Sequence, residues 1–165
     1  MEDNSALQNK VKSGLNSFLT MIVLTYLNIF LFLINSSVSF PFSAFIPSVL
    51  AAIANSLRQT GASPALILIL VSFAVIFTSI FLLLFFLSGK YLAPVWIALI
   101  LFILDTAAML YCAENIKSVA LDVLFHIWVI WSLASLIKAK LGLNKAEQTP
   151  GKSKKTAPKK SNSKK

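Results

Sequence analysis

The sequence predicts an all-α polytopic membrane protein with four transmembrane helices, a short interfacial helix and a disordered C-terminal tail. Hydrophobic residues make up 57% of the 165 residues and charged residues only 13%, whereas ordinary soluble domains are about 25% charged. Apolar runs of about 20 residues recur, and each is long enough to cross a hydrocarbon core of about 30 Å. Ten of the fifteen basic residues lie at or after Lys138. This composition excludes a soluble globular domain.

The chain begins with a polar N-terminal segment, residues 1–13, followed by a transmembrane domain at residues 14–143. Its first predicted span covers about 14–34 and contains Thr25 and Asn28, which either line a pathway or hydrogen-bond a neighbouring helix. A cleaved signal peptide is the alternative interpretation, because small residues precede a possible cleavage site after Ser39. Against it, the apolar stretch exceeds the usual length of about 7–15 residues and acidic residues precede it.

The connection at residues 36–62 is the longest in the chain. Pro41 and Pro47 exclude one continuous helix, because proline lacks an N–H group and clashes with the preceding turn. Apolar residues recur at helical spacing from 48 to 59, and Gly61 follows as a stop signal. We expect a short interfacial helix over about 48–59, which either packs on the bundle or rests on lipid.

Three more spans are predicted at about 63–87, 91–110 and 118–137. From residue 144 to residue 165 the chain consists mainly of lysine, serine and other polar residues. Such a segment buries too little apolar surface to offset the loss of chain entropy, so a disordered tail is predicted.

The distribution of basic residues predicts that both termini are cytoplasmic. Four spans place the termini on one side, and basic residues favour the cytoplasmic side of a membrane. Two basic residues, Arg58 and Lys117, fall on the opposite side. The terminal side carries Lys10, Lys12, Lys90, Lys138, Lys140 and Lys145 near the membrane.

Asp105, Asp122 and His126 form a candidate intramembrane polar cluster. Residues 91–104 would give only about 21 Å of helix, too short to cross, so Asp105 must lie within the third span. Asp105 and Asp122 are nearly symmetric about the turn between the third and fourth spans, which predicts similar depths in the outer third of the bilayer. Asp122 and His126 are four residues apart and share one helix face.

Three roles are open for this cluster. A charged group in the membrane interior costs about 2.5–3.5 kcal/mol, so such residues face the bundle and find partners. Two close carboxylates and a histidine that titrates near neutral pH suit a proton or cation site. The same groups can instead hold the helices together by hydrogen bonds. Alternatively, Asp122 reaches the interface and plays neither role.

The tail supplies a second candidate binding segment. It suits attraction to anionic lipid headgroups at the inner face, and contact with RNA or the ribosome is a further possibility because lysine binds phosphate as a point charge. The structural alternative is a segment that only sets orientation and solvates the terminus. Its basic residues are Lys145, Lys152, Lys154, Lys155, Lys159, Lys160, Lys164 and Lys165.

No motif for catalysis, metal binding or cofactor binding is found in the sequence. Cys112 has no histidine or second cysteine at the spacing of a zinc site. There is also no phosphate-binding loop, nucleophile elbow or His-Glu-x-x-His sequence. We therefore predict no enzyme activity, no metal and no cofactor.

The last span carries a resemblance to a known group of proteins. Residues 122–143, DVLFHIWVIWSLASLIKAKLGL, contain an acidic residue, a Phe-His-x-Trp run and a basic exit. This pattern resembles the last span of small bacterial four-span integral membrane proteins of no known activity. The matching positions are Asp122, Phe125, His126, Trp128 and Lys138. The resemblance implies a bacterial cytoplasmic membrane.

From these observations we expect a non-enzymatic membrane accessory or scaffold protein, whose basic tail binds anionic lipid or partners. The partner would be another membrane protein or a second copy of the chain. The alternative is a small oligomeric transporter or channel subunit that uses the intramembrane cluster. The first is favoured because the spans carry few polar residues and only one cluster, and because four spans are few to enclose a pathway alone.

Overall fold

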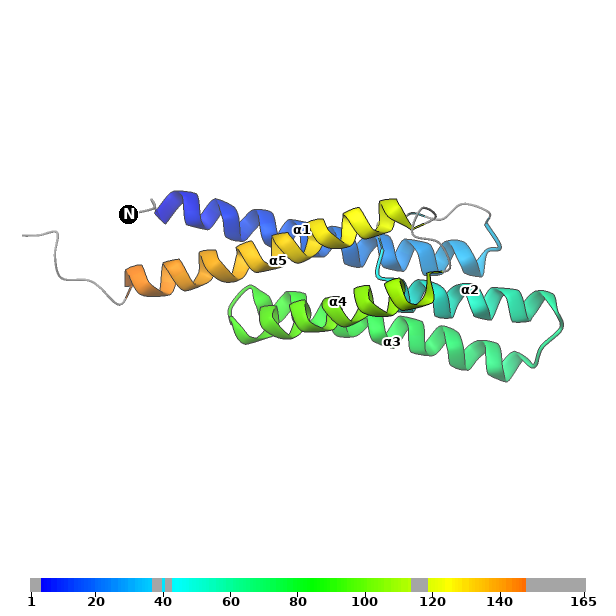
Figure 1. The fold of residues 1–165 in the computed structure, drawn as a ribbon. Helices are drawn as coiled ribbons and strands as arrows, with labels where there is room; N and C mark the ends of the chain where they lie inside the picture. Colours follow the sequence, from blue (N-terminus) through cyan, green and yellow to red (C-terminus); the bar gives the residue numbers. More distant parts are fainter. Residues whose placement is uncertain (1–3, 37–39, 41–42, 114–118, 148–165) are drawn as a thin grey trace, which may run out of the picture.

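The computed structural model describes residues 4–36, 40, 43–113 and 119–147. Four of its helices are long and apolar enough to cross a membrane, and the fifth, α2, is shorter. The predicted fold class is confirmed, since the described residues are helical with four candidate spans and contain no strand. The helices are α1 (Asn4–Leu33), α2 (Phe45–Gln59), α3 (Pro64–Ser88), α4 (Ala93–Cys112) and α5 (Ala120–Glu147) (Figure 1).

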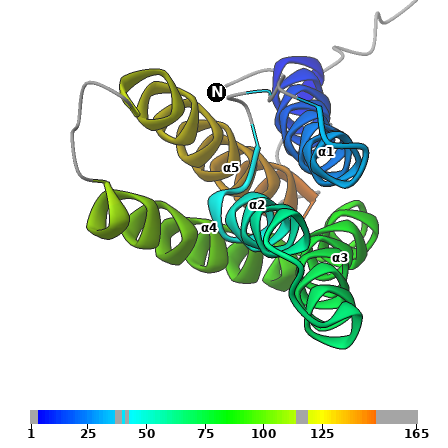
Figure 2. The ribbon, with the colours of Figure 1, turned by 90° about the vertical axis from the view of Figure 1, so that its right-hand side faces the viewer.

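The helices form one bundle in which the four long helices alternate in direction along the chain, whereas α2 runs in the same direction as α1 (Figure 1). α1 packs against α5 and α3, and α4 packs against the same two helices (Figure 1). α2 contacts α3, α1 and α4, and in the end-on view it lies among the other four helices (Figure 2). The shortest helix is therefore packed on three of the four long helices.

The interior of the bundle is aromatic and aliphatic. Phe18, Phe81 and Phe102 are fully buried, and their rings meet edge to face at centroid distances of 6.2 and 6.3 Å. Large apolar side chains such as Leu68 and Phe86 point outward and are about two-thirds exposed. In water these outward faces would be a liability, but in a bilayer they match the lipid chains.

α1 and α5 approach each other closely at Gly14. A Cβ atom added there would lie 2.8 Å from the Leu136 Cβ atom and 3.2 Å from the Ser132 carbonyl oxygen. Small residues at helix contacts let backbones approach in membranes, where packing rather than water exclusion drives association.

Two helices extend beyond the spans predicted from the sequence. α1 begins at Asn4 instead of about residue 14, so the polar N-terminal segment is helical from Asn4 onward. α5 continues to Glu147 rather than stopping near 137, so it includes the first residues of the predicted tail and places Lys145 in its last turn. Hydropathy marks where a helix can cross lipid but not where helical hydrogen bonding ends. The rest of the predicted tail lies outside the described residues.

α2 begins three residues earlier than the predicted 48–59. Pro47 lies in its first turn, where the missing N–H group removes no helical hydrogen bond. Its end at Gln59 is as predicted. Gly61 follows with φ 78°, and the N–H groups of Gly61 and Ala62 donate to the carbonyls of Arg58 and Leu57 at 3.2 and 3.0 Å. Of the two predicted placements, the structure has the helix packed on the bundle.

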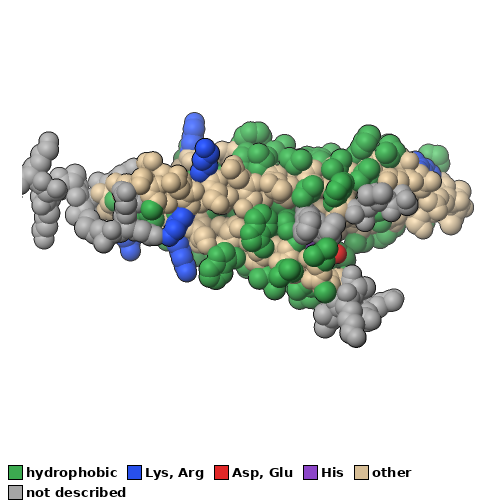
Figure 3. Space-filling view, turned by 90° about the horizontal axis from the view of Figure 1, so that it is seen from above, with side chains coloured by type: hydrophobic (Ala, Val, Ile, Leu, Met, Phe, Trp, Pro, Cys, Tyr) green, Lys and Arg blue, Asp and Glu red, His purple; other side chains and the backbone are tan. Residues whose placement is uncertain are grey.

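Among the described residues, basic side chains lie at the two ends of the bundle and not in its middle. The two ends of the described chain lie at the same end (Figure 1), which we call the lysine end. Figure 3 shows basic side chains near this end and an apolar middle. At the far end of the described structure the basic residue is Arg58, in the last turn of α2. Lys117 lies outside the described residues. The lysine end contains Lys10, Lys12, Lys90, Lys138, Lys140 and Lys145.

Candidate functional site: a buried helix start held by Asp105 and His126

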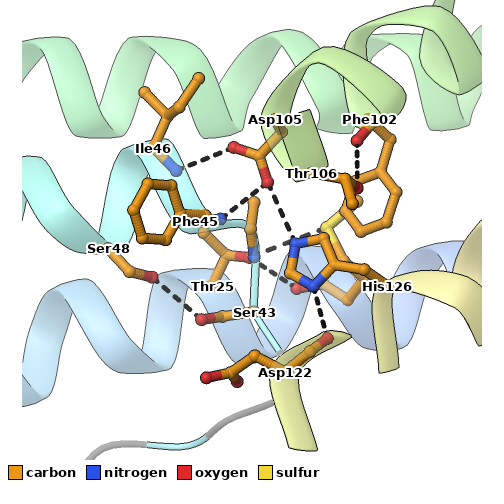
Figure 4. Close-up of polar contacts among 12 residues, drawn as sticks. Thr25, Ser43, Phe45, Ile46, Ser48, Phe102, Asp105, Thr106, Asp122 and His126 are labelled. Atoms are coloured by element: carbon orange, nitrogen blue, oxygen red, sulfur yellow. Dashed lines mark hydrogen bonds and ion pairs between the residues drawn. The ribbon is translucent and has the colours of Figure 1, made fainter. Parts of the chain in front are cut away.

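α2 starts inside the bundle. Its backbone N–H groups at Phe45 and Ile46 donate to the two carboxylate oxygens of Asp105, each at 2.8 Å (Figure 4). Asp105 is fully buried on α4, seven residues before that helix ends at Cys112, or about 10 Å along the axis. The chain thus leaves α1 at the far end, turns back into the bundle and returns along α2. We call α2 the re-entrant helix.

Every backbone N–H group at the start of the re-entrant helix has a hydrogen-bond acceptor. A helix leaves its first four N–H groups without intrahelical acceptors, which here belong to Ala44, Phe45, Ile46 and Pro47. Asp105 accepts from the middle two, and the Thr25 hydroxyl oxygen on α1 accepts from Ala44 at 2.9 Å. Pro47 has no N–H group. In lipid, an unsatisfied backbone group costs several kcal/mol, so this complete pairing makes a buried helix start possible.

The segment leading into the helix is held by α1. The Asn28 side-chain amide donates to the Phe40 carbonyl at 2.6 Å, and its oxygen accepts from the Phe40 N–H at 2.7 Å. The same amide also donates to the Ser43 hydroxyl at 2.7 Å, which in turn contacts the Ser48 hydroxyl at 2.9 Å. Non-helical backbone is tolerated at membrane depth only where protein surrounds and satisfies it. Asn28 meets this requirement for residue 40.

His126 connects α5 to the same carboxylate. Its Nδ1 lies 2.7 Å from the Asp122 carbonyl oxygen, and because a carbonyl only accepts, Nδ1 carries a proton and donates. Nε2 lies 3.3 Å from the Asp105 Oδ2 atom, with both side chains buried. This contact is attractive only when one proton lies between the two atoms. The Phe102 ring stacks on the imidazole at 4.8 Å.

Asp122 has a different environment from Asp105. Its carbonyl anchors His126, while its carboxylate points away from the imidazole (Figure 4). The side chain lines a cavity of about 190 Å³, whose other polar walls are Asn28, Ser43, Ser48 and His126. The two aspartates therefore do not share one site: one holds a helix start and the other faces a small polar cavity.

The bundle closes between this site and the lysine end. On the side toward the lysine end, Phe102 lies one turn from Asp105 along α4 and is fully buried. Val129 and Leu133 lie one and two turns from His126 along α5 and are also fully buried. Phe18 and Met21 fill the same level from α1. Within the described part of the chain, this apolar layer separates the Asp105–His126 pair from the lysine end.

The structure brings together two of the three residues predicted for the cluster. Asp105 and His126 are in contact, and Asp122 joins them only through its backbone. Sequence reasoning identified Thr25 and Asn28 as polar residues in a span but not their role, which is to bind the chain before α2. Their signal was available: an amide and a hydroxyl inside an apolar span need partners. Among the described residues, no group of three His, Cys, Asp or Glu side chains is arranged to hold a metal.

No family model, curated protein or solved structure matches this chain. The fold and the site by themselves define its class. It is a helical protein with four candidate membrane spans and a re-entrant helix, whose start is held by a buried aspartate that also contacts a buried histidine.

Proposed function

We propose that this protein is a non-enzymatic accessory or scaffold protein of the bacterial cytoplasmic membrane, with both termini in the cytoplasm. The observation that carries the proposal is the use of the buried polar groups around the start of α2 in internal bonds. Asp105 accepts two backbone N–H groups and contacts His126, and Thr25 and Asn28 bind the chain before the re-entrant helix. Groups committed in this way hold a fold together.

The proposed partners follow from the two ends and the outer faces. The basic tail, together with Lys145, would bind anionic lipid headgroups, and RNA or ribosome contact is the other use of such a segment. The apolar outer faces would pack against another membrane protein or a second copy of the chain. α1 would be retained, since Phe18 and Met21 contribute to the core and cleavage after Ser39 would remove them.

Ion flux in liposomes tests this proposal. Full-length protein would be reconstituted alone, and proton and monovalent-cation flux measured from pH 5 to 8 alongside empty liposomes and an Asp105→Asn variant. We expect no flux above empty liposomes for either protein, and lower thermal stability for the variant. Flux that is present in the wild type and lost in a folded Asp105→Asn variant would overturn the accessory role.

A small oligomeric transporter or channel subunit is the second candidate. It is favoured by one observation: the 190 Å³ cavity places Asp122 beside His126, which contacts the buried Asp105. A proton could reach the pair from that cavity, but the apolar layer toward the lysine end would have to open or be bypassed in an oligomer. In the same flux assay, Asp122→Asn would lower transport under this alternative and have no effect under the first.

A further inference from the structure

Lys140 is a buried cation at the lysine end of the bundle. Only 9% of its surface is exposed. The residue lies on α5, seven positions after the fully buried Leu133. Its ammonium donates to the carbonyl oxygens of Gly89 and Tyr91, in the turn between α3 and α4, at 3.3 and 3.4 Å. The side chain therefore crosses from α5 to the opposite hairpin.

These two bonds leave the ammonium incompletely compensated. An ammonium has three N–H donors, and both acceptors are neutral and at the long end of the hydrogen-bond range. A buried charge is costly unless it is paired with an opposite charge. Two carboxylate side chains are described, those of Asp105 and Asp122, and both lie toward the far end of α4 and α5. The side chain of Glu147, the last residue of α5, lies outside the described part of the structure. A counter-ion from outside the described protein would remove this cost.

A cavity of about 170 Å³ lies beside Lys140. A second cation, Lys90, and the Asn144 side chain line it, and Val11, Leu92 and Leu143 form its apolar walls. Water takes about 30 Å³ per molecule in the liquid, so the volume equals that of five or six waters and accommodates a phosphate group. Two lysines and an amide among apolar walls suit a group that is anionic at one end and apolar at the other.

We propose that this cavity binds the phosphate group of an anionic membrane lipid, with Lys140 and Lys90 as its cationic contacts and Asn144 as a neutral donor. Basic pockets between transmembrane helices at the cytoplasmic side are suited to lipid headgroups. The apolar walls would contact the glycerol and the first acyl carbons. The inference deepens the proposed lipid binding of the lysine end and rests on it for the orientation, but it assigns the binding to the bundle instead of the tail.

Lipid retention measured by native mass spectrometry tests the site. Full-length protein would be exchanged into detergent with equal amounts of phosphatidylglycerol and phosphatidylcholine of matched acyl chains. We expect the wild type to retain phosphatidylglycerol, and Lys140→Met to lower its occupancy by about fivefold or more, the effect of one lysine at a headgroup. Lys138→Met is the matched control, because it removes the same charge from an exposed position two residues away. The control should bind like the wild type.

Two further arms separate the possible sources of binding. Competition by inorganic phosphate would support the phosphate chemistry and assign the site to soluble anions as well as lipid. A full-length variant with the eight tail lysines changed to glutamine should keep the bound lipid; loss in this variant alone would place binding in the tail and overturn the proposal. Equal retention by Lys140→Met and the wild type would also overturn it. Thermal unfolding without added lipid confirms that each variant is folded.

Discussion

At the scale of single residues, Asp105 makes two kinds of contact that the sequence does not distinguish: it caps a helix start and it pairs with a histidine. Its carboxylate receives two backbone N–H groups from α2 and contacts His126 on α5. Ionised carboxylates accept stronger hydrogen bonds than neutral groups do, and a helix N-terminus favours negative charge. A single side chain on α4 thereby links three helices.

Asp105→Asn should lower the free energy of unfolding by about 2–3 kcal/mol. The amide keeps one acceptor oxygen, but its NH₂ group would face a backbone N–H or the His126 ring, leaving a buried donor unpaired. Thermal or denaturant unfolding in detergent would measure the loss. Asp122→Asn is the control, with an expected change below about 0.5 kcal/mol, because its carboxylate faces the cavity. Equal effects of the two substitutions would contradict the assigned roles.

Gly14→Ala should destabilise the contact between α1 and α5 by about 1–3 kcal/mol. The added methyl group would meet the Leu136 Cβ atom at 2.8 Å, and neither backbone can yield without separating the helices. The same substitution at Gly89 is the control, since a Cβ atom there meets its nearest neighbour, the Phe86 carbonyl oxygen, at an ordinary 3.5 Å. Unfolding midpoints in the same detergent compare the two, and a neutral Gly14 variant would refute close packing there.

At the scale of elements, the re-entrant helix is the feature that most depends on its surroundings. Its far end is also tied down: the Arg58 guanidinium donates to the Leu33 carbonyl at 2.9 Å, and Gln59 donates to the Asn35 side-chain oxygen at 2.8 Å. Asn35 itself takes φ 60° at the end of α1, a conformation that asparagine tolerates better than most residues. The start of α2 is thus bound in the interior of the bundle, and its other end is bound to the end of α1.

Thr25→Val should loosen the start of the re-entrant helix. Valine keeps the shape of threonine but cannot accept the Ala44 N–H bond, and the expected cost is about 1 kcal/mol. Hydrogen exchange of the amides from Ala44 to Ile46 should accelerate about fivefold. Thr20→Val is the matched control on the same helix, because the Thr20 hydroxyl bonds only to the Asn16 carbonyl of its own helix. Unchanged exchange at Ala44 in the Thr25 variant would refute the bond.

At the scale of the whole molecule, the arrangement of charge predicts how the protein lies in the membrane. The lysine end, where the described chain begins and ends, carries six lysines on described helices and turns, and the far end carries Arg58. The cytoplasmic side of a membrane favours the end richer in basic residues. The re-entrant helix and the Asp105–His126 pair would then lie in the half of the bundle away from the cytoplasm.

Cysteine labelling of intact cells tests this orientation. In a Cys112→Ser background, a cysteine at Gln59 should react with a membrane-impermeant thiol reagent, and a cysteine at Lys90 should react only after permeabilisation. Both positions are exposed, at opposite ends of α3. Native Cys112, also exposed, should behave like Gln59. Labelling of Lys90 but not Gln59 in intact cells would reverse the proposed orientation.

The sequence by itself determined the features that depend on composition over about twenty residues. The four spans follow from the length and apolarity of their segments, and the end of α2 follows from Gly61, because only a residue that tolerates positive φ closes the helix there without strain. The burial of Asp105 followed from its distance to the start of its span. These are local or additive properties, which a linear chain displays directly.

Only the tertiary structure decided where the start of α2 lies and which groups receive its backbone donors. Pro47 indicates that a helix starts nearby but not how deep in the bundle the start lies. The acceptors for the N–H groups at this helix start are Thr25 on α1 and Asp105 on α4, which are far from α2 along the chain. The burial of Lys140 likewise depends on a turn some fifty residues earlier. Hydrogen bonds between distant segments depend on the packing of whole helices, and no local pattern encodes that packing.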